Sequence, residues 1–489
     1  MAQPRRKGVG DDPNRSYQSP LASRYASQEM RELFSAHRRA VLWRQLWLAL
    51  AEVERELGLK IPKAPLRELA RRIQDVDFKA VARYEKQFRH DVMAHLHTFA
   101  DLHPPARPWL HLGATSCFVT DNADLMVFRN GLELIRDALG AVIGKLAEFA
   151  ERHKALPALG YTHFQPAQPT TVGKRACLWI QDLLMDLEEI ERLIRWLPLR
   201  GVKGTTGTQA SFLALFDGDH QKVKKLDKGL AHRLGFERCF AVTGQTYPRK
   251  VDSRILSVLS GVAQSAAKAG ADLRLLAHER ELEEPYESKQ IGSSAMAYKR
   301  NPMRAERMCS LARFVVHLPA NAADTASQQW LERTLDDSAN RRIVMAEGFL
   351  ALDSVLRIYH SIADGLIVNE PMVRAHLDRE LPFLCTEEVM MRATKKGGDR
   401  QLLHERIRVH SRAAVERLKG GAANNDLFER LAKDPAFKDV RDEFEEMASA
   451  DRLVGRAPRQ VGEFLRSEVK PALRKLSGRP GRKLQELDV

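Results

Sequence analysis

Three long segments place apolar residues alternately three and four positions apart, and this spacing constrains the fold more than any other feature. They cover residues 125–149, 180–197 and 255–276. A repeat close to 3.5 residues predicts long helices packed side by side at shallow angles. Because alternating β-branched runs are few, we expect a nearly all-α fold built around a long central helical bundle.

The predicted helices are long, about 35–45 Å each at ~1.5 Å per residue. Helices of that length present apolar flanks that one chain of 489 residues does not fully cover. The pattern therefore favours a bundle shared between subunits. Alanines and glycines within the stripe at 255–276 allow a neighbouring helix to approach closely there.

The length of the chain predicts more than one domain, because a single core stops growing well below 489 residues. Residues 1–20 are rich in Gly, Pro, Asp, Asn and Ser and are predicted to form a disordered tail. We expect an N-terminal helical domain at 21–115 and the bundle at 116–368. A C-terminal helical domain with a basic tail is expected at 369–489.

Composition favours a soluble, intracellular protein. Hydrophobic residues make up 44% of the chain and charged residues 29%, as in ordinary globular proteins. The N-terminus lacks an apolar run, so we expect no signal peptide, and no stretch approaches the roughly 18 apolar residues of a membrane span. The five cysteines form no CxxC pair, which favours a reducing compartment. We therefore expect a cytoplasmic location and no membrane partner.

The net charge of +14 is concentrated at the ends of the chain. Arg5, Arg6 and Lys7 supply +3 and residues 470–489 supply +4, so half of the excess lies in predicted tails. A basic chain suits nucleic acid, but no basic stripe interleaved with aromatic residues accompanies the charge. An enzyme for anionic substrates with solvated tails explains it as well, and a nucleic-acid partner is not expected.

Four polar stretches interrupt the helical patterns. Each alone is typical of an ordinary cap or loop, but together they supply His, Ser, Lys and Gln. Helix ends carry unpaired N–H groups that favour anions, so the four stretches predict a polar site between helices. They are HLGATS (111–116), GYTHFQPAQPTT (160–171), KGTTGTQASF (203–212) and IGSSAMAYKRNP (291–302).

The last of these stretches resembles a known signature. GSS-x-M-x-x-K-x-N at 292–301 is similar to the Gly-Ser-Ser-x-Met-Pro-x-Lys-x-Asn loop of the fumarase/aspartase superfamily. Further stretches resemble the adenylosuccinate lyases of the animal-like type, namely SPLASRYAS, RHDVMAHLHTF, LGATSCFVTDN, THFQPAQPTTVGKR, KGTTGTQASF and ERTLDDSANRR. Ala297 departs from the superfamily pattern, which has proline there.

The resemblance implies a three-domain, all-α homotetramer whose long central helices form a shared bundle. Each active site would draw residues from three subunits. The implied reaction is β-elimination of fumarate from adenylosuccinate, giving AMP, and from the succinyl-carboxamide ribotide SAICAR, giving AICAR, in purine nucleotide biosynthesis. It needs no metal and no cofactor, and the spacing of His90, His95 and His97 matches no helical HxxxH metal site.

A β-elimination needs a base, an acid for the leaving nitrogen, and cations that hold the developing negative charge. His163, fixed between a turn and Pro166, is the best acid candidate, with helix capping as its structural alternative. The resemblance offers Ser293 as the base, although a free hydroxyl is a poor base without N–H donors and a nearby cation such as Lys299. By resemblance, His90 pairs with His163 or holds substrate charge; the alternative is an ordinary helix histidine.

The resemblance also supplies substrate contacts. Arginine suits both phosphate and carboxylate because its planar fork binds two oxygens at once. The residues matching phosphate and ribose contacts are Arg24, Tyr25, Arg333, Ser338 and Arg342, and those matching base and succinyl contacts are Arg89, Asp91, Thr115, Ser116, Gln245 and Arg307.

Two alternatives to this function stay open on the sequence alone. Another fumarate-releasing lyase of the superfamily shares the loop, but has no reason to carry the phosphate-binding stretches SRY and TLDDSANRR. A catalytically silent helical scaffold or nucleic-acid binder would not need the combination of His163, Ser293 and Lys299.

Overall fold

The computed structural model describes residues 16–287 and 289–477. Most of the predicted disordered tail, residues 1–15, lies outside the described residues. Ser19, within the same predicted tail, donates a hydrogen bond to Glu347 at 3.0 Å. Among the described residues, no helix is both long and apolar enough to cross a membrane.

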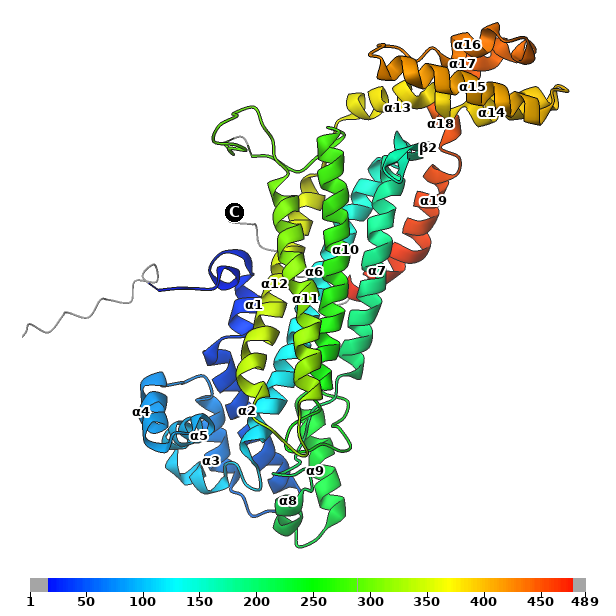
Figure 1. Cartoon of the computed structure of the whole chain (residues 1–489). Helices are drawn as coiled ribbons and strands as arrows, with labels where there is room; N and C mark the ends of the chain where they lie inside the picture. The colour runs from blue at the N-terminus through cyan, green and yellow to red at the C-terminus, as the bar shows by residue number, and fades with distance from the viewer. Residues whose placement is uncertain (1–15, 288, 478–489) are drawn as a thin grey trace, which may run out of the picture.

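A bundle of long helices forms the centre of the molecule (Figure 1). Its helices are α6 (Ser116–Arg152), α7 (Val172–Trp196), α10 (Lys250–His278), α11 (Met303–Ser327) and α12 (Asp337–Gly365). The three predicted segments correspond to α6, α7 and α10, which confirms the helical prediction. With 37 residues, α6 is about 55 Å long, longer than the expected 35–45 Å.

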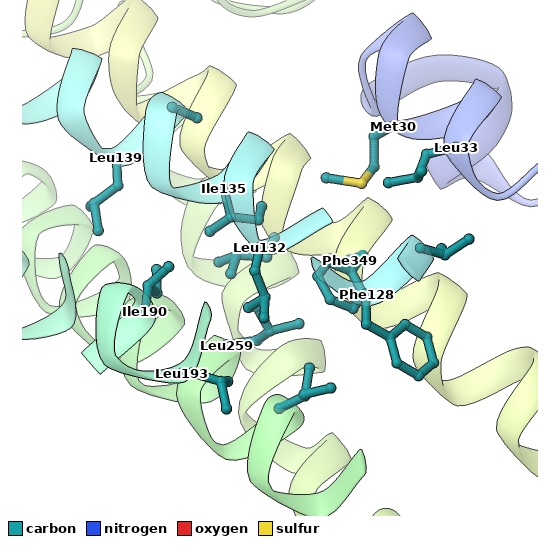
Figure 2. Close-up of a cluster of buried hydrophobic side chains, with 14 of the residues drawn as sticks. Met30, Leu33, Phe128, Leu132, Ile135, Leu139, Ile190, Leu193, Leu259 and Phe349 are labelled. Atoms are coloured by element: carbon teal, nitrogen blue, oxygen red, sulfur yellow. The ribbon is translucent and has the colours of Figure 1, made fainter. Parts of the chain in front are cut away.

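The apolar stripes point into one shared core. Figure 2 shows Leu132 and Ile135 of α6 among side chains from α7, α10 and α12. Phe128 of α6 stacks on Phe349 of α12 with ring centroids 6.0 Å apart. Fully burying one such side chain stabilises the fold by about 1.5–3 kcal/mol, so the stripes explain why these helices associate.

The predicted close approach at the third stripe is also present. A Cβ on Gly270 of α10 would lie 2.6 Å from the Cys309 sulfur of α11. Such a distance is well inside van der Waals contact, so a larger residue at 270 would force the two helices apart.

The N-terminal region packs along the lower part of the bundle (Figure 1, blue to cyan). Ser27 and Ser35 cap successive helices by accepting N–H hydrogen bonds from Met30 and Arg38. The elements are η2 (Leu21–Tyr25), α1 (Gln28–Leu33), α2 (Ala36–Glu56), α3 (Lys63–Arg71), α4 (Phe78–Phe88), α5 (Asp91–Asp101) and η3 (Pro104–Trp109).

Short elements connect the long helices. The strands β1 (Pro157–Thr162) and β2 (Gln165–Thr171) form an antiparallel hairpin, and β3 (Leu282–Glu283) pairs with β4 (Ile367–Val368). The helices α8 (Ala210–Leu215) and α9 (His220–Arg233) lie at the lower end of the molecule (Figure 1).

The C-terminal region has a second hydrophobic core, around Leu403, Leu427 and Phe437. The domain limits at 115/116 and 368/369 stay a prediction. The elements of this region are α13 (Glu370–Leu384), α14 (Thr386–Lys395), α15 (Arg400–Lys419), α16 (Leu427–Lys433), η4 (Pro435–Phe437), η5 (Arg441–Glu443), α17 (Phe444–Met447) and α18 (Ala450–Leu453).

The chain then returns to the bundle through α19 (Ala457–Phe464), η6 (Leu465–Val469) and α20 (Lys470–Ser477). Leu476 of α20 packs over Gly140 of α6, where an added Cβ would lie 2.6 Å from the leucine. The start of the predicted basic tail is therefore a docked helix, because its leucines gain burial against α6. Residues 478–489 of the predicted tail lie outside the described residues.

Glu54 is a fully buried carboxyl on α2 with no hydrogen-bond partner among the described residues. Burial raises its pKa from 4.5 to about 8. The unfolded chain ionises this group at lower pH than the folded chain, so stability is lost as the pH rises from about 4.5 to about 8. We predict that Glu54→Met raises the free energy of unfolding by on the order of 2 kcal/mol near pH 8.5, and by much less near pH 5.

Thermal unfolding of the two proteins across this pH range measures the difference. Glu56→Met is the control, since Glu56 lies on the exposed side of the same helix and its ion pair with Arg233 is worth little. A gain for Glu54→Met that does not grow with pH contradicts the prediction.

Candidate active site

The Arg89-His90-Asp91 triplet forms the junction between α4 and α5. Arg89 ends α4 in the left-handed conformation with φ 55°, and His90 is the N-cap of α5. A non-glycine residue at positive φ is unusual and clusters at functional sites. The turn projects all three side chains into a cavity next to the N-terminus of α5.

That cavity has a volume of about 660 Å³, enough for a nucleotide-sized ligand. The N-termini of α5, α6 and α12 all reach it, and helix N-termini favour anions through their free N–H groups and dipoles. The cavity brings together nine of the predicted site residues, which are Arg89, His90, Asp91, Thr115, Ser116, Gln245, Arg333, Ser338 and Arg342.

His90 is fixed by two hydrogen bonds. Its Nδ1 accepts the N–H of Met93 at 3.4 Å, as the cap of α5. The proton of the neutral ring therefore lies on Nε2, which donates to the Ser116 hydroxyl at 3.2 Å. The ordinary role of a capping histidine and the predicted role at the site are thus compatible, because the same ring that caps α5 faces the cavity.

Arg333 and Gln245 line the same cavity. Arg333 donates to Oε1 of Gln245 at 3.0 Å and contacts the sulfur of Cys117. The Gln245 amide also donates to the Thr205 carbonyl at 3.0 Å. The predicted stretch 203–212 therefore supports the cavity wall through its backbone. Cys117 lines the cavity but was not predicted as a site residue, and burial raises its pKa.

A buried ion network forms part of the cavity lining. Arg249 is only 4% exposed and donates two hydrogen bonds to Asp121 of α6, at 3.1 and 3.2 Å. It donates a third to Asp337, the first residue of α12, at 2.6 Å. Although burial disfavours its charge, the facing Asp121 carboxylate keeps the pKa of Arg249 above its ordinary value. Arg249 thus ties the start of α12 to α6.

A second group of predicted residues lies outside this cavity. Arg24 and Arg307 both face the Tyr25 ring, at 6.0 and 5.7 Å from its centroid. The Tyr25 carbonyl accepts a hydrogen bond of 2.5 Å from Arg357 of α12, so η2 is held against the bundle. These three predicted residues are brought together with one another, but not with the nine in the cavity.

The signature loop is closed at its base. The Asn301 amide donates to the Gly292 carbonyl at 2.8 Å. A Cβ on Gly292 would lie 2.1 Å from the Lys299 carbonyl oxygen, so only glycine fits there. The Ser293 hydroxyl accepts the N–H groups of Ala295 and Met296 at 3.3 and 3.1 Å. Two N–H donors favour negative charge on that oxygen, as a serine base requires.

Ala297 occupies the second position of a β-turn, in which the Lys299 N–H donates to the Met296 carbonyl at 3.0 Å. Proline is favoured at this position, and within the described chain the Ala297 N–H has no backbone hydrogen bond to lose. We predict that Ala297→Pro stiffens the loop. It should stabilise the ordered loop by about 0.4–1 kcal/mol, because proline reduces the conformational entropy of the unfolded segment. Limited proteolysis should cut the variant loop more slowly, and turnover should change. If both the cleavage rate and turnover stay the same as in the parent protein, the prediction is wrong.

His163 lies at the tip of the β1–β2 hairpin. Thr162 pairs with Gln165, so His163 and Phe164 form a two-residue turn, and both have positive φ, 53° and 57°. Two positive φ values identify a type I′ turn, which fits the twist of a hairpin but is strained for these residues. The turn leaves the imidazole exposed, and His163 does not line the cavity.

One chain therefore presents the predicted residues in separate places: the cavity, the Tyr25 group, the signature loop and the hairpin tip. Figure 1 shows the hairpin and the loop at the upper end of the bundle, far from α4 and α5. The ion network of Asp121, Arg249 and Asp337 was not predicted. Its signal was weak, since arginines and aspartates in helix patterns are usually solvated surface residues.

Fold and motifs define a lyase of the fumarase/aspartase type. Residues 26–316 match the family described as Lyase, and residues 382–464 match the family described as Adenylosuccinate lyase C-terminus. The crystal structure of a fumarate lyase from Mesorhizobium sp. BNC1 has the same fold, with a TM-score of 0.79, 23% identity, and coverage of 92% of this chain and 100% of that one.

Comparison with related sequences identifies the family within this class of lyases. The chain is 50% identical over 461 residues to the adenylosuccinate lyase of Schizosaccharomyces pombe, covering 94% of this chain and 96% of the relative. It is 49% identical over 459 residues to the adenylosuccinate lyase of Schistosoma mansoni, with the same coverage. The chain belongs to the adenylosuccinate lyases.

Proposed function

We propose that the cavity, the signature loop and the hairpin combine into an active site that cleaves adenylosuccinate to AMP and fumarate. Adenylosuccinate lyase activity belongs to purine nucleotide biosynthesis and follows from the roughly 50% identity to curated relatives. SAICAR is proposed as a second substrate, because it joins the same succinyl group to a ribotide phosphate. The observation that carries the proposal is the convergence of nine predicted residues and three helix N-termini on one cavity.

The phosphate and ribose are proposed to bind at the start of α12. Ser338 and Arg342 lie in the first turns of that helix, where the free N–H groups and the helix dipole favour a dianion. Arg333 adds a planar fork beside Gln245, with their side chains 3.0 Å apart. Arg24 and Tyr25 would complete this subsite from another copy of the chain.

The succinyl group and the nucleobase of the substrate are proposed to bind near the start of α6. Thr115 is the N-cap of that helix, and its side chain makes no capping hydrogen bond, so its hydroxyl faces no competing intrahelical donor. Ser116 and His90 are already hydrogen-bonded across the cavity. Arg89, together with Arg307 from another copy of the chain, would bind the carboxylates that the elimination leaves on fumarate.

The proposed elimination uses Ser293 as base and His163 as acid. The Ser293 oxygen, in its ionised form, removes the proton from the carbon next to a succinyl carboxylate, and the electron pair is delocalised onto that carboxylate. When the carbon–nitrogen bond breaks, this pair forms the new double bond, and the nitrogen leaves with the electrons of the broken bond and a proton from His163. Lys299 and the loop N–H groups stabilise the charge that accumulates on the carboxylate before the bond breaks.

The proposed active site is shared within a homotetramer. Because the hairpin tip and the loop lie away from the cavity of their own chain, other copies must supply them. Several large apolar side chains on the bundle helices support association, since a soluble monomer rarely exposes so many on one set of helices. They are Leu178, Met185, Leu275, Phe314 and Ile343. We also propose a cytoplasmic location, in keeping with five free cysteines.

The test is direct. The purified protein is incubated with adenylosuccinate, SAICAR or argininosuccinate, and fumarate and the second product are identified by chromatography. Release of fumarate from the first two, and none from argininosuccinate, is the expected result. Absence of fumarate from both purine substrates would falsify the proposal.

A further inference from the structure

Glu281 lies at a junction of three parts of the chain. It follows the end of α10 and directly precedes β3, and its side chain is almost completely buried, at 1% exposure. One carboxylate oxygen accepts a hydrogen bond from Nδ1 of His376 in α13 at 3.0 Å. The other faces Nη1 of Arg175 in α7 at 3.7 Å. A buried carboxylate is costly unless paired, so these two partners fix where the charge lies.

From Glu281 the chain continues into the stem of the signature loop. Glu283 pairs with Arg300 at the far end of the loop, at 3.2 Å. Glu284 accepts the backbone N–H groups of Arg304 and Ala305, at 2.8 and 2.9 Å, and so caps α11 where the loop ends. Both ends of the loop are therefore bound to the short segment that begins at Glu281.

The second partner, Arg175, holds the hairpin. Its guanidinium donates a hydrogen bond of 2.6 Å to the Leu159 carbonyl in β1. Tyr161 lies two residues further along β1. Burial, together with the nearby negative charge of Glu281, raises the pKa of its hydroxyl to about 12. Glu281 thus faces the arginine that fixes the strand leading to His163.

The third partner brings in the C-terminal region. His376 belongs to α13, which packs against both strands of the hairpin. Gln168 of β2 also donates to Glu387 of α14 at 2.9 Å. The β3–β4 pair adds a backbone link, because the Asn369 N–H donates to the Glu281 carbonyl at 2.9 Å just before α13 begins.

We propose that Glu281, together with Arg175 and His376, is a positioning junction that holds the His163 hairpin and the Ser293 loop in one fixed relation. This inference rests on the proposed function for the roles of His163 and Ser293. In a shared site the hairpin and the loop of one chain serve different active sites, so the junction also links neighbouring sites. None of the three side chains lines the cavity.

The test replaces Glu281 by Gln, which keeps its shape and removes its charge. Misplacing reacting groups by about 1 Å costs up to ~100-fold in rate, so we expect kcat to fall about 10- to 100-fold while KM changes less than about threefold. Glu279→Gln is the matched control, because Glu279 also approaches His376, at 3.9 Å, but is 31% exposed. The control should keep the parent kcat.

A second pair of variants separates positioning from simple loss of structure. Asn places a donor near the position of the histidine Nδ1, so His376→Asn should retain activity, whereas His376→Leu should lose it. In Glu281→Gln and His376→Leu, limited proteolysis within 289–300 should become faster at unchanged oligomeric state. The cleavage readout does not require activity, so a parent protein that releases no fumarate overturns the proposed function without deciding this inference.

Two outcomes overturn the junction. The first is a parent-like kcat in both Glu281→Gln and His376→Leu. The second is a loss of activity that follows the loss of thermal stability, with loop cleavage unchanged, since that would make Glu281 a merely structural residue.

Discussion

His163→Asn lowers kcat by about 10²- to 10⁴-fold and leaves the fold intact. General acid catalysis by a positioned side chain contributes an effect of this size, and Asn has no titratable group to supply the proton. His163 is exposed at the tip of a type I′ turn, with φ 53°, and Asn tolerates that backbone conformation better than most residues. The substitution therefore removes the acid without disturbing the hairpin.

Steady-state kinetics with adenylosuccinate, beside circular dichroism of each variant, measures this effect. His220→Asn is the control, since His220 is exposed on α9 and does not line the cavity. If His163→Asn keeps kcat within about tenfold of the parent, another group supplies the proton.

Arg249→Met destabilises the protein by about 3–5 kcal/mol, because it leaves the buried carboxylates of Asp121 and Asp337 without their partner. Those side chains are only 2% and 1% exposed, so their negative charges are poorly solvated once the guanidinium is removed. The same change frees the start of α12, which carries Ser338 and Arg342. We therefore expect weaker substrate binding as well as a lower melting temperature.

Chemical denaturation measures the loss of stability, and Arg71→Met provides the comparison. Arg71 pairs with Glu68 at 2.7 Å, but its side chain is 74% exposed, so its removal should cost less than about 1 kcal/mol. Arg249→Lys should fall between the two, since one ammonium cannot pair with both aspartates in the same geometry. Equal effects of Arg249→Met and Arg71→Met would show that the network does not stabilise the site.

The sequence predicted the bundle where burial is strong and regular. The stripes of α6, α7 and α10 carry large residues at a 3.5 repeat, and nearly all of these are buried. The helix α11 lies within the predicted bundle region 116–368, but no apolar stripe marked it, because its buried positions are few and mostly small, including Ala305, Ala312 and Ala322. Close packing of small residues leaves almost no hydrophobic signal in a sequence.

The candidate site was predicted mainly through family resemblance. Local chemistry favours a polar site at helix ends, but the pairing of Arg249 with Asp121 and Asp337 depends on contacts over distances of 128 and 88 residues. Sequence patterns report local geometry, so such a network is invisible to them. The hairpin that carries His163 is also short and polar, and prolines in GYTHFQPAQPTT obscure its strand pattern.

The most direct test of a shared active site mixes two inactive variants. His163→Asn and Ser293→Ala are dissociated, combined and reassembled, and fumarate release is measured. If hairpin and loop reach each site from different chains, random assembly gives about one quarter of the sites both intact groups, and about that fraction of parent activity returns. The control mixes His163→Asn with a chain carrying both substitutions, which should stay inactive. A His163→Asn and Ser293→Ala mixture as inactive as its components would contradict a site that takes its hairpin and its loop from different chains.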